Sequence, residues 1–220
     1  MRAFKLIGVL GAILALVAIA ATTASAEVEF LPGTAGTKFT NAGEKATLTA
    51  KNSKGETVAV TCAKAKSTGE LLSSKEALIL ITFETCTSAG VPVNSVGDAG
   101  GTILTHVEAK ACTITSSPLV GGILLKPLPV TLEAPLLKLK IEVEGDVIGR
   151  LLAENVSQKE FKLDLNLKEG KQEFTKCKDG AGAELTEELK ANVDAGGFLP
   201  ATESAIGGKL TFTVNEEWMT

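Results

Sequence analysis

The segment over residues 58–87 constrains the fold most, because two cysteines lie beside two apolar, β-branched runs within it. Cys62 ends the run VAVTC, and Cys86 closely follows the run ALILITF. The residues between these runs are polar and include Ser67-Thr68-Gly69, which favours a turn. Val, Ile, Thr and Phe favour strands. The segment therefore predicts a β-hairpin or strand pair joined by one disulfide.

The four cysteines predict two disulfides, and three pairings are possible. We favour Cys62–Cys86, which closes a short loop, and Cys112–Cys177, which joins the middle of the chain to its last third. A metal site would need closely spaced ligands, whereas the chain has no CxxC motif and a single histidine. We therefore predict no metal and no other cofactor.

Residues 1–26 have the pattern of a secretory signal peptide. Arg2 and Lys5 precede an apolar run over residues 6–21, and Ala24-Ser25-Ala26 matches a small-residue cleavage site. The run is shorter than the about 20 residues that a membrane-spanning helix needs. We therefore predict cleavage after Ala26, no stable membrane span afterwards, and a secreted protein that is free or loosely held at the cell surface. Disulfides fit this compartment.

The charge balance argues against nucleic acid as a partner. The chain has 22 Lys and Arg against 26 Asp and Glu, a formal net charge of −4, and loss of Arg2 and Lys5 would make it more acidic. Nucleic acids and anionic membrane surfaces need a basic face.

Strand signals recur along the rest of the chain. Residues 77–83 are apolar on both faces, which predicts a central, fully buried strand. Residues 137–143 alternate apolar and charged side chains, as a half-buried strand does. The pattern predicts one all-β domain over residues 27–220, an antiparallel sandwich or barrel of many short strands. Residues 183–193 fit a short amphipathic helix as well as a strand.

Several short motifs occur in an order that resembles a known group of proteins. They are Val60-Thr61-Cys62, Ser67-Thr68-Gly69-Glu70, Ile81-Thr82-Phe83 with Cys86, Gly100-Gly101-Thr102-Ile103, Glu144-Gly145-Asp146-Val147-Ile148, Gly170-Lys171-Gln172, Gly196-Gly197-Phe198 and Asn215-Glu216-Glu217. In this order they resemble a group of exported, uncharacterised proteins of soil actinobacteria, over most of the mature chain. Members often carry a further cysteine where this chain has Pro92-Val93-Asn94-Ser95. The resemblance therefore carries over no disulfide pairing, and it implies no activity, cofactor or catalytic residue.

The loop over residues 87–101 is the candidate binding segment. Asn94, Ser95 and Asp98 lie there among glycines, and long loops on β-scaffolds often carry recognition. Chemistry for catalysis is sparse, because His106 is the only histidine and no GxSxG motif supplies a nucleophile. We interpret His106 as a structural or surface residue.

These observations favour an exported, non-catalytic binding or structural module at or outside the cell envelope, with an envelope polymer or a protein as partner. One alternative is a secreted hydrolase that uses the carboxylates of Glu142, Glu144 and Asp146, which could share a strand face. Another is a carrier of a small apolar ligand in a barrel interior. One Trp and no Tyr argue against sugar binding by aromatic stacking.

Overall fold

The computed structural model describes residues 28–30, 34–52, 54–152, 160–165, 167–168, 171–194, 202–203 and 205–214. The signal peptide predicted over residues 1–26 lies outside the described residues. Regular structure in the described ranges consists of antiparallel strands and one single-turn 3-10 helix, η1 (Pro135–Leu137). The all-β prediction is confirmed.

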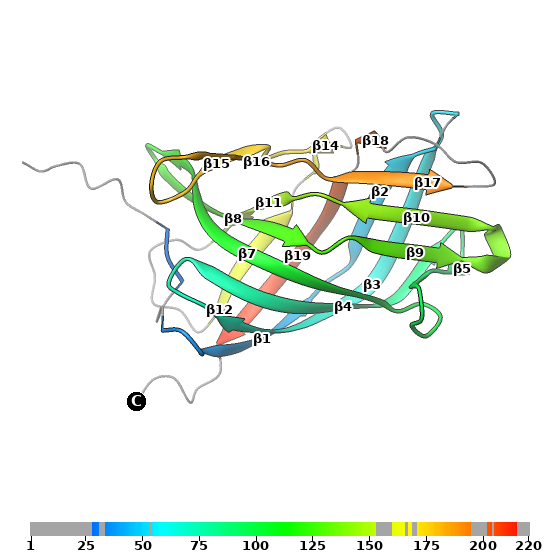
Figure 1. Ribbon diagram of the computed structural model, residues 1–220, viewed down its shortest axis with the longest axis horizontal. Helices are drawn as coiled ribbons and strands as arrows, with labels where there is room; N and C mark the ends of the chain where they lie inside the picture. Colours follow the sequence, from blue (N-terminus) through cyan, green and yellow to red (C-terminus); the bar gives the residue numbers. More distant parts are fainter. Residues whose placement is uncertain are drawn as a thin grey trace, which may run out of the picture.

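The larger sheet closes on itself into a barrel, which Figure 1 shows from the side. Antiparallel neighbours follow one another in the order β3 (Thr57–Leu71), β4 (Glu76–Ser88), β7 (Ile103–Ser116), β8 (Leu119–Pro127), β11 (Val147–Leu151), β12 (Glu160–Leu165) and β19 (Ala205–Val214). Strands β1 (Lys38–Gly43) and β2 (Ala46–Lys51) lie end to end between β19 and β3. Each pairs with both neighbours, which completes the ring.

A second sheet packs against one side of this barrel. Its strands follow the order β18 (Thr202–Glu203), β17 (Lys190–Asp194), β10 (Leu139–Glu144), β9 (Val130–Ala134) and β6 (Asn94–Ser95). The two sheets share one long hairpin, because β8 continues into β9 and β10 continues into β11 (Figure 1). The fold thus combines the two predicted architectures. It is a barrel, and one wall of the barrel forms a sandwich with the second sheet.

Proline and glycine set the places where this hairpin changes sheets. Pro127 ends β8 and Pro129 precedes β9, and proline cannot donate a ladder hydrogen bond. On the return strand, Gly145 has a φ of 96°, and a Cβ there would overlap the carbonyl of Glu188. Only glycine fits such a left-handed, crowded position.

Aliphatic side chains fill both layers. The barrel interior contains Ile79, Ile81, Val107 and Leu125, among others. A second cluster fills the space between barrel and second sheet, and Phe83 packs against both clusters. The scarcity of large aromatic residues is consistent with this composition, since β-branched and Leu side chains form most of the core.

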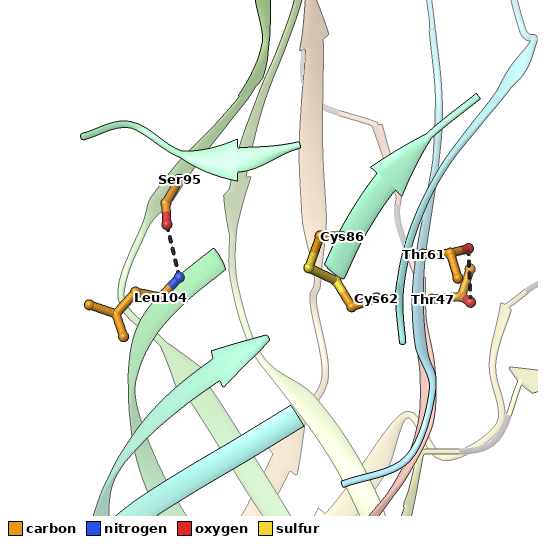
Figure 2. The surroundings of a disulfide bond; sticks show 6 residues. All are labelled: Thr47, Thr61, Cys62, Cys86, Ser95 and Leu104. Carbon is orange, nitrogen blue, oxygen red and sulfur yellow. Dashed lines mark hydrogen bonds between the residues drawn. A yellow bond between two sulfur atoms is a disulfide. The ribbon is translucent and has the colours of Figure 1, made fainter. Parts of the chain in front are cut away.

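Both predicted disulfides are present, and together they account for all four cysteines. Cys62 and Cys86 lie opposite each other in β3 and β4 (Figure 2). Cys112–Cys177 joins β7 to β15 (Lys176–Lys178), which pairs with β16 (Glu184–Thr186). This second bond holds the β15–β16 hairpin over a small outer cluster that includes Leu124 and Ile148.

Short strands complete the described structure: β5 (Val91–Pro92) at the edge of β4, and the separate pair β13 (Leu167–Lys168) and β14 (Lys171–Gln172). The open question over residues 183–193 is resolved in favour of strand, because β16 and the first part of β17 occupy them. Within β17, Ala191 and Val193 point into the core.

Two local predictions are wrong. Ser67-Thr68-Gly69 is not a turn, because β3 continues to Leu71 and the chain turns over residues 72–75. Small residues are needed there on the inner face, where Ser67 is buried and the ring of Phe39 lies against Gly69. Residues 77–83 form a strand, but not a fully buried one, since the side chain of Leu78 faces outward and is 47% exposed.

Candidate functional site

The three predicted binding residues lie together, and they form hydrogen bonds with one another and with the fold. Ser95 Oγ accepts from the Leu104 amide at 2.8 Å (Figure 2). It also donates to Asp98 Oδ2 at 2.6 Å. Asn94 Nδ2 donates to the Ser95 carbonyl at 3.0 Å and to Glu133 Oε1 at 3.2 Å. These bonds fasten the loop to the second sheet. Ligand binding by Asn94, Ser95 and Asp98 stays a prediction.

The three carboxylates considered for hydrolysis lie near lysines. Glu142 and Glu144 are on the outer side of β10, and Asp146 follows the turn at Gly145. Lys140 Nζ donates to Glu142 Oε1 at 2.7 Å, and this hydrogen bond, with the charge of Glu142, raises the pKa of Lys140. Asp146 forms an ion pair with Lys126 at 3.3 Å. Glu142 and Asp146 thus each have a lysine partner.

A hollow of about 620 Å³ lies on the outer face of the barrel and crosses β1, β3, β4 and β7. Thr40, Thr68, Leu80 and His106 form one row across it, each opposite the next in register. Leu128 ends the row, because its amide donates to the His106 carbonyl at 2.8 Å. His106 is exposed on this outer face.

The hollow combines exposed aliphatic side chains with charged ones. Leu78 is 47% exposed and Leu128 is 54% exposed, while Leu80 is half-buried. Lys38, Glu70 and Glu108 also line the hollow, and their exposed side chains carry charges of both signs. Each lies two residues along its strand from a residue of the first row. The buried residues Phe39, Ile79 and Val107 lie beneath, in the barrel core.

This surface was not predicted from the sequence, because the apolar residues that form part of it were interpreted as buried. Residues 77–83 are apolar at every second position on both faces, and that pattern is typical of a strand covered on both sides. Here the inner residues Ala77, Ile79 and Ile81 are buried, whereas Leu78, on the other face, is 47% exposed. Leu128 lies between Pro127 and Pro129, where no period-2 alternation assigns its side chain to a face of the sheet.

Metal ligation and membrane spanning are two further properties that bear on the site. Among the described residues, no group of three or more His, Cys, Asp or Glu side chains is arranged to hold a metal ion. Within the ranges given above, no helix has the length and the apolar character needed to cross a membrane.

Comparison of the chain with protein-family models, with curated proteins and with solved structures found no match in any of the three.

Proposed function

We propose that this chain is an exported, non-catalytic binding module that holds an apolar segment of a protein partner in the hollow across β1, β3, β4 and β7. The observation that carries the proposal is the exposure of Leu78 and Leu128, each about half exposed within one hollow. Exposed apolar side chains gathered in a concave patch with a polar rim are typical of protein interaction sites. The two disulfides support an oxidising, extracellular location.

The side chains of the hollow favour a protein over a sugar polymer. Sugar rings are commonly held by stacking on exposed Trp or Tyr, whereas the hollow presents Leu78, Leu80 and Leu128. Among the described residues that line it, only Phe39 has a phenyl ring, and that ring is buried. Aliphatic partner side chains would pack on the exposed leucines, and the mixed charges of Lys38, Glu70 and Glu108 would suit the polar groups of a polypeptide.

The test measures retention of the folded 27–220 fragment on washed envelopes of the cells that produce it. Leu78→Glu and Leu128→Glu each replace an exposed leucine of the hollow with a charged side chain. The matched control is Leu136→Glu, because Leu136 is 83% exposed and lies outside the hollow, in η1. Circular dichroism confirms that each variant is folded. A second set of envelopes is treated with protease before the assay.

We expect retention of the unchanged fragment and of Leu136→Glu, at least tenfold weaker retention of the two hollow variants, and loss of all retention after protease treatment. Equal retention of all four proteins would overturn the assignment of the hollow. Retention that survives protease treatment would overturn a protein partner in favour of a polymer, and no retention at all would overturn binding at the envelope.

A further inference from the structure

A second hollow lies inside the molecule, where the barrel interior meets the second sheet. It has a volume of about 100 Å³. Ile81, Val107 and Leu125 line it from the barrel core, and Val60, Leu132 and Val143 line it from the core beneath the second sheet. It is separate from the outer hollow, and the inference drawn from it does not depend on the proposed function.

A local change in strand alternation separates the two cores at this level. In β3 the buried side chains run from Cys62 directly to Ala65, and in β4 inward-facing Phe83 is followed by buried Cys86. In each strand, two successive residues thus point away from the core, and the two pairs lie opposite each other. Thr85, in the β4 pair, has a φ of 55°. The inward rows on either side of this irregularity are therefore out of step.

The side chains at the resulting junction do not close it. Ala46, Val60, Val130, Val143 and Val147 all line the cavity. Protein interiors are close-packed and contain few voids larger than a water molecule. A cavity of about 100 Å³ has the volume of roughly three water molecules in the liquid.

The apolar lining disfavours the binding of water and of charged molecules. Among the described residues of the lining, only Thr105 has a polar side chain apart from the disulfide-bonded Cys62. The Thr105 hydroxyl lies 3.4 Å from the His106 carbonyl. A buried water needs two to four polar partners, and apolar cavities of this size stay dry and accept small apolar molecules. We propose that this junction cavity is a binding site for a small, uncharged, apolar molecule of the size of one aromatic ring or a short branched alkane.

The proposal is tested with a ligand that consists of one aromatic ring. The probe for the test is benzene, added to the intact folded protein with its disulfides formed. The measurement follows the methyl ¹³C shifts of Val60, Leu132 and Val143 against those of Leu124, which is buried in the separate outer cluster.

We expect saturable shifts at the methyl groups of all three cavity residues, none at Leu124, and a rise in melting temperature with benzene. In Val143→Leu, which fills part of the cavity, benzene affinity should fall at least fivefold. The wild-type spectra keep the test decisive if that variant does not fold. No saturable shift, or shifts confined to Leu78 and Leu128 on the outer hollow, would overturn the proposal.

Discussion

The ring of Phe39 occupies the space where a side chain on Gly69 would lie. Phe39 and Gly69 are opposite each other in β1 and β3, and a Cβ built on Gly69 would be 2.6 Å from Cε2 of Phe39 and 2.8 Å from the Leu78 carbonyl. The pair thus lets one of the few aromatic side chains of the barrel core pack closely against the backbone of β3.

Gly69→Ala should therefore destabilise the protein. The added methyl group must displace the Phe39 ring or the backbone of β4, and overpacking of this kind costs about 1–3 kcal/mol. Urea unfolding measures the free energy. Gly100→Ala is the control, since the nearest atom to its added Cβ is Pro92 Cβ at 3.9 Å, and its effect should stay within about 0.5 kcal/mol. Equal effects of both substitutions would contradict the packing argument.

Replacing both Cys112 and Cys177 with Ala should loosen the β15–β16 hairpin. The bond spans 65 residues, and the chain-entropy model gives about 4 kcal/mol for such a loop. A register pair between Lys178 and Thr113 and an ion pair from Lys110 also hold the hairpin on the barrel. We expect hydrogen exchange of residues 176–178 and 184–186 to rise at least tenfold.

The control for this prediction replaces Cys62 and Cys86, whose bond spans 24 residues in the β3–β4 hairpin. This change should lower global stability by about 3.5 kcal/mol while exchange in β15 and β16 rises only as far as global unfolding requires. A selective rise in hydrogen exchange of the β15–β16 hairpin in the variant that lacks Cys62 and Cys86 would contradict the prediction. It would show that the Cys112–Cys177 bond does not by itself hold the hairpin on the barrel.

Acid should weaken the turn between β15 and β16. The Asp179 carboxylate accepts from the amides of Ala183 at 2.9 Å and Ala181 at 3.0 Å and from Lys110 Nζ at 3.2 Å. The Ala183 amide, followed by the Lys110 hydrogen bond, lowers the pKa of Asp179 below its ordinary 3.8. Because the folded pKa is lowered, this stabilisation is present above about pH 3.8 and is lost as pH falls through the folded value.

Amide ¹⁵N shifts of Ala181 and Ala183, followed from pH 6 to pH 2, measure this transition. Asp179→Asn should abolish it, because the amide side chain does not titrate. Glu144→Gln, at an exposed position of β10, should leave it unchanged. A transition that persists in Asp179→Asn would assign it to another group.

Ser95→Ala should destabilise the loop that joins the two sheets. The hydroxyl of Ser95 bridges Asp98 and the amide of Leu104, and leaving such groups unpaired costs about 1–3 kcal/mol. The matched control is Ser116→Ala, at an exposed end of β7, with an expected effect within about 0.5 kcal/mol. Thermal and urea unfolding of both variants check the difference, and a neutral Ser95→Ala would free this residue for the predicted binding role.

Much of the fold could be predicted from local patterns. Period-2 alternation located β10, and the β-branched runs beside Cys62 and Cys86 located the disulfide-linked hairpin. The turn at residues 67–69 was predicted wrongly because small residues on the inner face of a barrel have the same composition as a turn. Only the position of the Phe39 ring, far away in sequence, shows why Gly69 belongs in a strand.

The candidate site could not be predicted from the sequence, for a different reason. Alternation separates the face of Leu78 from that of Ile79, but it does not tell which face a second layer covers. The second sheet covers the wall around Val60 and Cys62 and leaves Leu78 and Leu128 uncovered. That outcome depends on where the long hairpin formed by β8 and β9 with β10 and β11 bends, which is a long-range property of the chain.

The closure of the barrel also sets a condition on synthesis. Residues 38–43 pair with β3 on one side and with residues 205–214 of β19 on the other. While the chain is being made, β1 to β4 can pair with one another, but the outer edge of β1 stays open until β19 has been completed. Pairings between such distant segments form slowly, and an open strand edge can pair with other chains. Interrupted synthesis before residue 205 should therefore yield products that aggregate instead of shorter soluble forms of the protein.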